Sequence, residues 1–357
     1  MAKDKPNLRK FKADSEGSMP LYAQLEQFFI TEIRKGVYKP ETPLPSIAEI
    51  DSQISLGRVT IVRTMQELVK DGFAVGIHGK GYYVTHRGEK ALIGIVAPFN
   101  TVYMQIYVHL AAGVRNASDK LDNEVIIMSS DEEPRRFIQG VNEFINYRGS
   151  RWLILVPPMD HQERIFPEPM KLLEKIKRLK DIRIAIIDRN LQDDIFQVRQ
   201  DRIAGNLLLL KRATQKKCRK VLFLNAYMDR WEVHGDKLFS TLAREAAGID
   251  PSMKLSLKST ETPAQDLKHI LKEKFDAVLT DDLYARKIVN IAGSRRPFHI
   301  AGYNGMAAAT SISPQITTVN SNLTEAGQIA VDYLFEKREF EGNVVNVKPF
   351  LVEGETF

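Results

Sequence analysis

From residue 92 onward, the sequence alternates short apolar runs with longer segments that carry apolar residues at helical spacing. Runs that are apolar at almost every position are typical of parallel strands buried on both faces, and strands that alternate with helices form α/β folds. The runs fall into two sets, 92–96, 124–128, 152–156 and 182–187, then 221–224, 255–257, 277–279 and 300–302. We therefore predict a doubly wound α/β body in two lobes, with any ligand at the carboxyl ends of its strands.

The sequence before this body predicts a small unit of helices followed by a hairpin. Ser46 and Glu49 have the spacing of a capping box, which marks the start of a short helix. A turn at 55–57 leads into a second helix, and two short strands then flank a turn at 78–81. The inward residues of the second helix, at i, i+4 and i+7, are Ile61, Met65 and Leu68. This arrangement predicts a winged helix-turn-helix, a shape that contacts DNA.

Several short motifs follow one another between residues 18 and 84. They are Pro20-Leu21-Tyr22, Gly36, Leu44-Pro45-Ser46, Arg58-x-Thr60, Leu68, Gly72 and Gly79-Lys80-Gly81. In order and spacing they resemble the DNA-binding domain of the GntR family. The resemblance implies double-stranded operator DNA as a partner, contacted by Ser46, Arg58, Thr60, Arg63, His78, Gly79, Lys80 and Gly81. The chain departs from the family at Gly57, where serine is usual, and at Ala48, where arginine is usual, so we expect a weaker helix cap and an altered operator.

A second set of motifs runs from residue 92 to the end of the chain. It comprises Ile93-Gly94-Ile95-Val96, Gly113-Val114, Ser130-Asp131-Glu132-Glu133-Pro134, Ile187-Asp188-Arg189, Val198-x-x-Asp201, Asp276-Ala277-Val278, Asp282, Ile300-Ala301-Gly302-Tyr303, Pro314-Gln315-Ile316-Thr317-Thr318-Val319 and Glu325-Ala326-Gly327. These motifs resemble the LacI/GalR-type effector domain, which is similar to periplasmic sugar-binding proteins. A GntR-type head on such a body resembles regulators of the arabinose repressor type. The resemblance implies a homodimer that binds a small-molecule effector, expected to be a monosaccharide.

These patterns divide the chain into parts. We predict a disordered basic tail at 1–17, the winged helix-turn-helix at 18–84, a linker at 85–90, and an effector-binding and dimerisation domain at 91–357. The resemblance implies three crossings between the lobes, near 188–191, 318–320 and 340–344. The first lobe would then hold about 91–190 and 320–341, and the second about 191–319 and 342–357. The helix expected at 106–121 would lie in the dimer interface.

A sugar is bound by side chains that both donate and accept hydrogen bonds, and by aromatic rings that pack on its apolar face. The candidates on loops after strands are Phe99, Tyr103, Tyr107, Asp188, Arg230, Trp231, Asp281 and Asn304. The resemblance places Asp188, Asp281 and Asn304 at ligand-contacting positions. The three candidates at 99–107 suit the core equally well, and either aspartate could instead hold a turn, as we expect for Asp282. Asn304 replaces the usual acid and Glu232 the usual arginine, so either Arg230 takes that role or the effector differs.

Composition and charge bear on the kind of partner and on the cellular compartment. The formal net charge is +6, and residues 1–90 contain 14 Lys and Arg against 11 Asp and Glu. This excess is small, so charge alone fits a solvated surface as well as a nucleic-acid partner. The single cysteine, Cys218, excludes a disulfide framework, and the sequence shows neither a signal peptide nor an apolar run of about 18 residues. We therefore expect a cytoplasmic protein that does not enter a membrane.

Motifs of enzymes do not occur in the sequence. Gly79-Lys80-Gly81 lacks the ending of a P-loop, and there is no Gly-x-Ser-x-Gly or His-Glu-x-x-His. Asp193-Asp194 and Asp281-Asp282 are adjacent, so their carboxylates would point apart instead of flanking a substrate. We expect no catalysis, no metal and no cofactor. The expected function is a sequence-specific transcription regulator, a repressor of carbohydrate-utilisation genes that a small sugar releases from its operator. An activator, or a sensor of a nucleoside or sugar phosphate, is the alternative.

Overall fold

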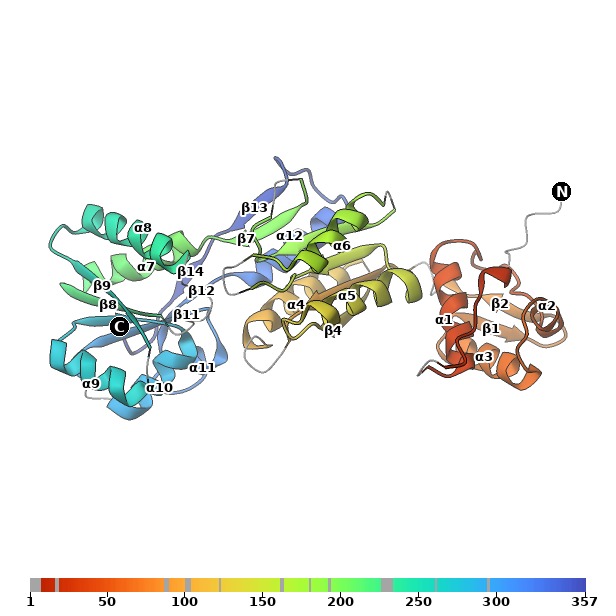
Figure 1. The fold of residues 1–357 in the computed structure, drawn as a ribbon, viewed down its shortest axis with the longest axis horizontal. Helices are drawn as coiled ribbons and strands as arrows, with labels where there is room; N and C mark the ends of the chain where they lie inside the picture. Colours follow the sequence, from red (N-terminus) through yellow and green to blue (C-terminus); the bar gives the residue numbers. More distant parts are fainter. Residues whose placement is uncertain are drawn as a thin grey trace.

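The structure is a computed structural model that describes residues 8–16, 19–86, 90–99, 104–121, 123–160, 164–179, 181–191, 194–225, 234–260, 262–293 and 296–357. Three units follow one another along the long axis (Figure 1): a small head in red and orange, a first lobe, and a second lobe at the far end. None of the helices in this described part combines the length and apolar character needed to span a membrane. The head lies beside the first lobe and away from the second.

The head is the predicted winged helix-turn-helix. It contains α1 (Leu21–Arg34), α2 (Ile47–Gln53), α3 (Arg58–Lys70) and an antiparallel hairpin of β1 (Ala74–Ile77) and β2 (Gly81–Val84). The capping box is confirmed, because Ser46 Oγ accepts a hydrogen bond from the N–H of Glu49 and the Glu49 carboxylate accepts one from the N–H of Ser46. The predicted inward residues Ile61, Met65 and Leu68 are fully buried. They form one core with α1 and the hairpin.

The structure corrects the predicted disordered tail at residues 8–16. Leu8 begins a short 3-10 turn (Leu8–Lys10) and is fully buried in the core of the head. The ring of Phe11 packs edge-on against Phe28, with 5.7 Å between the ring centroids. Burial of these two apolar side chains offsets the entropy lost when the segment is ordered. The basic residues around them concealed two core positions in the sequence, while residues 1–7 and 17–18 lie outside the described part.

The first lobe is a six-stranded parallel sheet in the order β13-β7-β6-β5-β3-β4. Its strands are β3 (Leu92–Ala97), β4 (Glu124–Ser129), β5 (Trp152–Leu155), β6 (Arg183–Ile187), β7 (Gln197–Gln200) and β13 (Val344–Val347). Helices α4 (Met104–Asp119) and α12 (Leu323–Leu334) cover one face, while α5 (Pro134–Asn142), the π-helical turn η3 (Glu143–Tyr147) and α6 (Pro167–Lys177) cover the other. Helices α4 and α12 cross closely at Gly113 and Gly327, where an added Cβ would lie 2.0 and 2.5 Å from a carbonyl oxygen of the opposite helix.

The second lobe has a sheet of the same size in the order β14-β12-β11-β10-β8-β9, in which β14 alone runs antiparallel to its neighbour. Its strands are β8 (Lys220–Asn225), β9 (Lys254–Ser259), β10 (Ala277–Leu279), β11 (His299–Tyr303), β12 (Thr317–Asn320) and β14 (Phe350–Val352). The helices are α7 (Arg202–Gln215) and α8 (His234–Ile249) on one face, and α9 (Pro263–Glu273), α10 (Asp282–Ala292) and α11 (Ala307–Thr310) on the other. The predicted doubly wound α/β body in two lobes is confirmed.

The crossings between the lobes differ from the prediction at two of three places. Because β7 pairs with β6 and β13 pairs with β7, both strands belong to the first sheet. The first crossing therefore lies at 200–202 instead of 188–191, and the third at 347–350 instead of 340–344. The second crossing follows β12, next to the predicted 318–320. Strands β7 and β13 lie at one side of the sheet and carry polar residues, so their sequences lack the continuous apolar run that marked the central strands.

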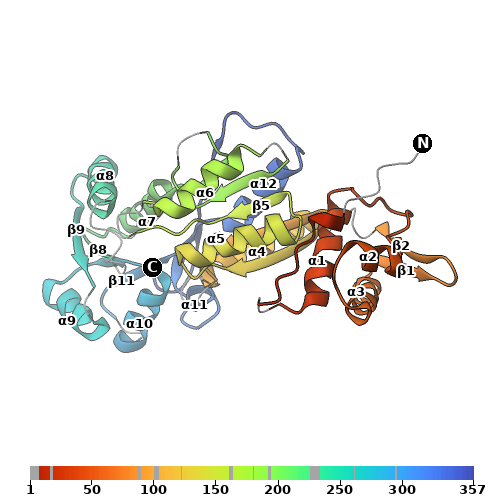
Figure 2. The same ribbon diagram turned by 45° about the vertical axis from the view of Figure 1, so that its right-hand side comes forward.

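The head is held on the first lobe by direct contacts besides the chain connection. Figure 2 shows α1 on the side of the head that faces this lobe. Arg34 forms an ion pair with Glu124 at the start of β4, with 2.5 Å between Nη2 and Oε2. Thr31 Oγ1 donates a hydrogen bond to the carbonyl of Tyr147 at 2.5 Å, and an added Cβ on Gly149 would lie 3.3 Å from Thr31 Cα. The end of α1 is therefore seated on the turn that follows η3.

Candidate functional site

The first candidate surface is the exposed side of α3. Arg58 and Arg63 are exposed, and Thr60 is half-buried. The Arg63 guanidinium lies 3.8 Å from the centre of the Tyr22 ring, so its stem is directed along the start of α1. Gly57 caps α3 without a side-chain hydrogen bond, as expected from the departure at this position. The predicted residues of this helix thus share one solvent-facing surface with two positive charges.

The wing contributes a second exposed segment beside this helix. The turn between β1 and β2 contains His78, Gly79 and Lys80 and is followed by Gly81, the first residue of β2, and all four residues are exposed. The two glycines have φ values of +72° and +98°, a backbone region that favours glycine, so the tight turn depends on them. Ser46 is also exposed, but its hydroxyl is engaged in the capping box of α2. Its role in the structure is therefore to start that helix.

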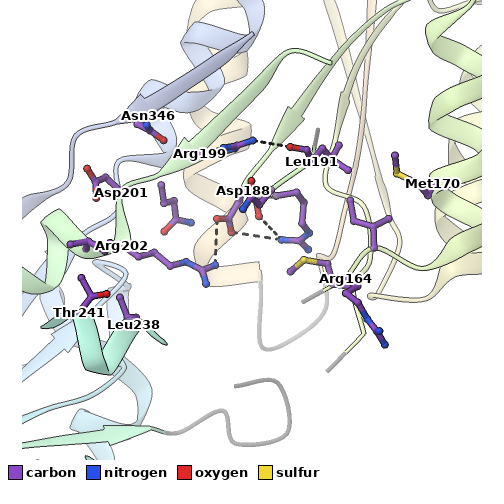
Figure 3. A pocket seen from close by; sticks show the side chains of 16 residues that line it. Arg164, Met170, Asp188, Leu191, Arg199, Asp201, Arg202, Leu238, Thr241 and Asn346 are labelled. Carbon is purple, nitrogen blue, oxygen red and sulfur yellow. Dashed lines mark hydrogen bonds and ion pairs between the residues drawn. The ribbon is translucent and has the colours of Figure 1, made fainter. Parts of the chain in front are cut away.

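The second candidate site is a cavity of about 760 Å³ that lies between the lobes (Figure 3). Its lining combines six arginine and aspartate side chains with six apolar ones. The lining residues are Met159, Arg164, Ile165, Met170, Asp188, Arg189, Asn190, Leu191, Arg199, Gln200, Asp201, Arg202, Ile203, Leu238, Thr241 and Asn346. Because the cavity receives residues from the first lobe and from α7 and α8 of the second, its shape depends on how the lobes are placed.

Asp188 is the polar centre of this cleft. It directly follows β6 and has φ = +54°, an unfavourable region for a side chain other than glycine that is tolerated where surrounding contacts fix it. Its carboxylate accepts a hydrogen bond from Tyr107 at 3.3 Å and lies 3.8 Å from Arg189. Arg202, the first residue of α7, reaches it from the second lobe at 3.5 Å, as Figure 3 shows. The ion pair between Asp188 and Arg202 therefore joins the two lobes across the cleft.

A buried ion pair supports Asp188 from below. Arg189 is 3% exposed at its side chain and contacts Glu132, 8% exposed, at 3.1 Å. Arg189 also donates to the carbonyl of Pro157 at 2.5 Å and to the Tyr107 hydroxyl at 3.3 Å. Burial raises the pKa of Tyr107 above its ordinary value, so the phenol keeps the proton that it donates to Asp188. These bonds hold the wall of the cleft in one arrangement.

The second lobe presents polar atoms at the carboxyl ends of its strands. Asp281 caps α10, since its Oδ1 accepts a hydrogen bond from the N–H of Tyr284 at 3.0 Å. Its Oδ2 is buried without a hydrogen-bond partner among the described residues, as are Thr280 Oγ1 and the Tyr303 hydroxyl. Burial raises the pKa of Asp281. Unpaired buried polar atoms are costly, and these three stand at the ends of the neighbouring strands β10 and β11.

Asp282, which follows Asp281, has the structural role expected from the sequence. It is fully buried and accepts hydrogen bonds from the N–H of Met306 and from Thr318 Oγ1, both at 2.6 Å. Burial raises the pKa of Asp282 to about 7. An added Cβ on Gly302 would lie 1.9 Å from its carboxylate, so the glycine of this motif makes room for the acid. Asp282 therefore ties the start of α10 to β12 and to the segment before α11.

The structure brings the predicted effector residues into two groups. Phe99, Tyr107 and Asp188 lie together in the first lobe, with the two rings edge-on at 6.3 Å. Asp281 and Asn304 follow the adjacent strands β10 and β11, and Asn304 has φ = +102°. Neither of these two lines the cavity at Asp188. Tyr103, Arg230 and Trp231 lie outside the described residues.

Three residues of the ion-pair network around Asp188 were missed by the sequence analysis. Glu132 and Arg189 belong to motifs identified in the sequence. Their positions after different apolar strands did not indicate that the two side chains form an ion pair with each other. Arg202 was missed because the first crossing was placed too early, which hid that the residue after the Asp201 cap enters the second lobe at the cleft. An N-cap aspartate followed by arginine would have been the available signal.

Comparison with known proteins identifies the head. Residues 21–84 match the family model described as "Bacterial regulatory proteins, gntR family". These residues are a GntR-type head. The chain is 36% identical over 77 residues to the histidine utilization repressor of Pseudomonas aeruginosa, which covers 21% of this chain and 31% of that protein. It is 28% identical over 135 residues to the arabinose metabolism transcriptional repressor of Geobacillus stearothermophilus, 36% of each chain. This chain thus spans about a third of the length of these curated relatives.

Solved structures identify the fold of the body behind the GntR-type head. The periplasmic binding ribose operon repressor protein from Lactobacillus acidophilus superposes with a TM-score of 0.55 at 19% identity, over 75% of this chain and 98% of that one. A periplasmic binding protein/LacI transcriptional regulator from Alkaliphilus metalliredigens, complexed with D-xylulofuranose, gives 0.55 at 14% identity, over 75% and 99%. The body therefore has the LacI-type, periplasmic-binding-protein-like fold.

Proposed function

We propose that this chain is a sequence-specific DNA-binding transcription regulator, a repressor of carbohydrate-utilisation genes that a small sugar releases from its operator. The observation that carries the proposal is the presence in one chain of a GntR-type head with an exposed basic helix and of a two-lobed body with a polar cleft. A head of this kind suits contact with a polyanion, whereas the cleft suits a small ligand. The protein acts by binding and not by catalysis.

In this proposal the head holds operator DNA through α3 and the wing. Arg58 and Thr60 contact base edges from the start of the helix, the part that enters the major groove in helix-turn-helix proteins. Lys80 and His78 at the wing tip contact the phosphate backbone, together with Arg63. Two repressors named for histidine utilization and arabinose metabolism share sequence with part of this chain, which supports the assignment.

The effector is proposed to be a monosaccharide held between the lobes. A cavity of about 760 Å³ falls in the range usual for small-molecule sites. Asp188 and Arg202 supply acceptors and donors from opposite lobes, and Asp281 supplies an unpaired carboxylate oxygen. Hydroxyl groups of a sugar can satisfy all three, because each hydroxyl both donates and accepts, provided that the lobes close and bring Asp281, which does not line the cavity, to the ligand. The relative from Alkaliphilus metalliredigens, which binds D-xylulofuranose, supports this ligand class.

We further propose that the protein acts as a homodimer that pairs through the first lobe. The outer face of α4 exposes Val108 at 49%, and the edge strand β4 exposes Ile127 at 39%. An interface formed by the same patch on both subunits would cover these side chains and give two heads related by a two-fold axis. Light scattering should then show a dimer at micromolar concentration, and Val108→Glu should shift it toward monomer. A wild-type monomer would contradict this part of the proposal.

The whole proposal is tested with the full chain. Duplexes selected from a random pool should converge on a pseudo-palindrome with two half-sites. A thermal-shift screen of monosaccharides and their phosphates should find a ligand that raises Tm, since a ligand at 100 times its Kd stabilises by about 2.7 kcal/mol. Selection that yields no common sequence would contradict the DNA half of the proposal. A screen in which no sugar raises Tm would contradict the effector half.

A further inference from the structure

One apolar side chain on the head is far more exposed than any other. Val59, the second residue of α3, is 83% exposed, while no other large apolar side chain in the described part of the chain exceeds 55%. A single exposed apolar residue is ordinary on a protein surface, but one on the face proposed to meet DNA has a different setting. The exposure of this apolar side chain on the face proposed to meet DNA therefore requires a physical explanation.

The geometry of α3 explains the exposure. The core side of this helix is formed by Ile61, Met65 and Leu68, which are fully buried. At about 100° per residue, Val59 projects from the opposite side of the helix. Val62, one turn later, is half-buried and extends the apolar surface along the helix. No contact among the described residues of the head therefore requires valine at position 59.

The surroundings of Val59 indicate what covers it. Arg58 and Arg63 are exposed on the same helix, and the wing carries exposed Lys80. A cationic border suits a polyanion and disfavours an apolar protein partner, whose surface would have to desolvate these charges. Gly57 has no side chain, and an added Cβ there would meet no atom within 4 Å, so the start of the helix is narrow and open. This shape allows the first turn of α3 to approach a groove closely.

We propose that Val59 is a specificity-determining residue that contacts the 5-methyl group of a thymine in the major groove, beside the base pair contacted by Arg58. The inference rests on the proposed function, because it requires operator DNA on this face of α3. The thymine methyl is the apolar group among the base-edge groups of the major groove. Valine has no hydrogen-bonding atom in its side chain, so its preference among bases comes from burying this methyl against its own two. Arginine and threonine on the same turn supply the polar contacts.

The experiment replaces thymine with deoxyuridine, which lacks only the 5-methyl group. The full-length protein is used with an operator selected from random duplexes, and each thymine is replaced in turn, in both half-sites together. At one symmetric position, affinity should fall about fourfold for each half-site, the factor expected when one buried methyl group is lost. The other positions should show little change. Fluorescence anisotropy at one fixed salt concentration measures the affinities.

Variants locate the contact on the protein. Val59→Ala should bind the thymine and deoxyuridine operators equally, whereas Val59→Ile, which keeps an apolar branch, should retain the difference. The matched control is Val69→Ala, an exposed valine (38%) in the last turn of the same helix, which should respond as the wild type does. Val59→Ala should also not lower Tm, because the side chain makes no core contact and alanine favours helices. Wild-type and Val59→Ala protein, each measured with the thymine and the deoxyuridine operator, form a double-mutant cycle. This cycle isolates the free energy of the contact between the thymine methyl group and Val59.

The outcomes separate the inference from the proposed function. If an operator is selected but no deoxyuridine position weakens binding, the inference fails while the DNA-binding proposal stands. Equal deoxyuridine sensitivity in the wild type and Val59→Ala would also overturn it. If no operator sequence emerges from the selection, both fail together. A sensitive position that becomes insensitive in Val59→Ala, and not in Val69→Ala, supports the assignment of Val59.

Discussion

The head and the cleft are built in opposite ways. The surface of the head that we propose to face DNA comes from one helix and one turn within residues 58–81, and its charged side chains are exposed. The cleft is assembled from segments as distant as 132 and 346, and its central residues are buried and bonded together. A surface built from one helix and one turn keeps its shape when the lobes move. A cleft built from distant segments changes its shape when those segments move. We infer that the head contributes recognition and the cleft contributes response.

The comparison is tested most strongly at Arg58. Arg58→Ala should weaken operator binding by roughly 1–3 kcal/mol for each half-site and relax specificity at one position of the operator, because it removes a base-edge contact. The sugar-induced rise in Tm should be unchanged, since the cleft shares no residue with α3. Anisotropy titrations and thermal shifts on the same preparation measure both. An intact operator affinity would show that α3 does not enter the groove.

Lys80→Ala is the matched contrast for Arg58→Ala, because both remove one positive charge from the exposed surface of the head. If Lys80 contacts phosphate, its loss should weaken binding to all sequences alike and reduce the salt dependence of the affinity. A loss confined to one operator position would assign Lys80 to base contact instead. The two variants therefore distinguish a contact to phosphate, which depends on charge, from a contact to a base edge, which depends on sequence.

Asp281 tests the cleft side of the comparison. Asp281→Asn keeps an oxygen that can cap α10 but replaces the unpaired carboxylate oxygen with an amide, so it should weaken sugar binding by about 2 kcal/mol, the scale of a hydrogen bond to a charged group. Operator affinity without sugar should stay near the wild-type value. Isothermal titration with the sugar found by screening, beside the melting curve, measures the effect. A variant that melts early and still binds sugar fully would make Asp281 a purely structural cap.

Asp282 tests whether the stability of the second lobe, which forms one side of the cleft, depends on pH. Its pKa is raised from 3.8 to about 7 by burial, so the folded state holds this proton more tightly than the unfolded state. The associated stability is present below about pH 4 and is lost as pH rises through 7, with a slope of at most about 1.4 kcal/mol per pH unit. Asp282→Asn should remove this part of the decline. Calorimetry of the second lobe between pH 5 and 8 measures it, with the exposed Glu245→Gln as control.

The smallest expected effect concerns the cap of α3. Gly57 has φ = −61° and ψ = 141°, values that serine adopts freely at an N-cap, so Gly57→Ser should stabilise the head by a few tenths of a kcal/mol. Ser46→Ala is the opposite change, since it removes an existing capping box and should cost about 1 kcal/mol. Sugar binding should be unaffected by either. Thermal unfolding of the head gives both values, and a destabilising Gly57→Ser would contradict the capping role assigned to position 57.

The same contrast explains what could be predicted from the sequence. The capping box of Ser46 and Glu49 and the inward residues Ile61, Met65 and Leu68 were predicted correctly, because each depends on residues three to seven positions apart. The central strands of both lobes were also predicted, because burial on both faces leaves an uninterrupted apolar run. Local spacing and continuous burial are therefore visible in a single sequence.

Features that depend on distant partners were not visible. Leu8 was assigned to a disordered tail because its burial depends on the core that the later helices form. Strands β7 and β13 were assigned to the wrong lobe because each is held by the other across more than a hundred residues. The pair of Glu132 and Arg189, and the bridge from Arg202 to Asp188, likewise follow from the topology and not from any spacing in the chain.

The contact between α1 and the first lobe gives the cleft a direct route to the head. Arg34 and Thr31 attach the end of α1 to this lobe, so a movement of the lobe would carry the head with it and alter the separation of two heads in a dimer. A sugar can shift this arrangement only if it binds one placement of the lobes better than the other. The size of the shift is limited by that difference, typically about 1–3 kcal/mol.

The most direct test of this account is operator affinity measured with and without saturating sugar, using the monosaccharide that raises Tm most in the screen. The account predicts that the sugar weakens operator binding by about 5- to 150-fold in the wild type. At the same sugar concentration, Asp281→Asn should retain the affinity that it has without sugar. An operator affinity that stays constant in the wild type, at sugar concentrations that clearly raise its Tm, would contradict the claim that the cleft controls the head.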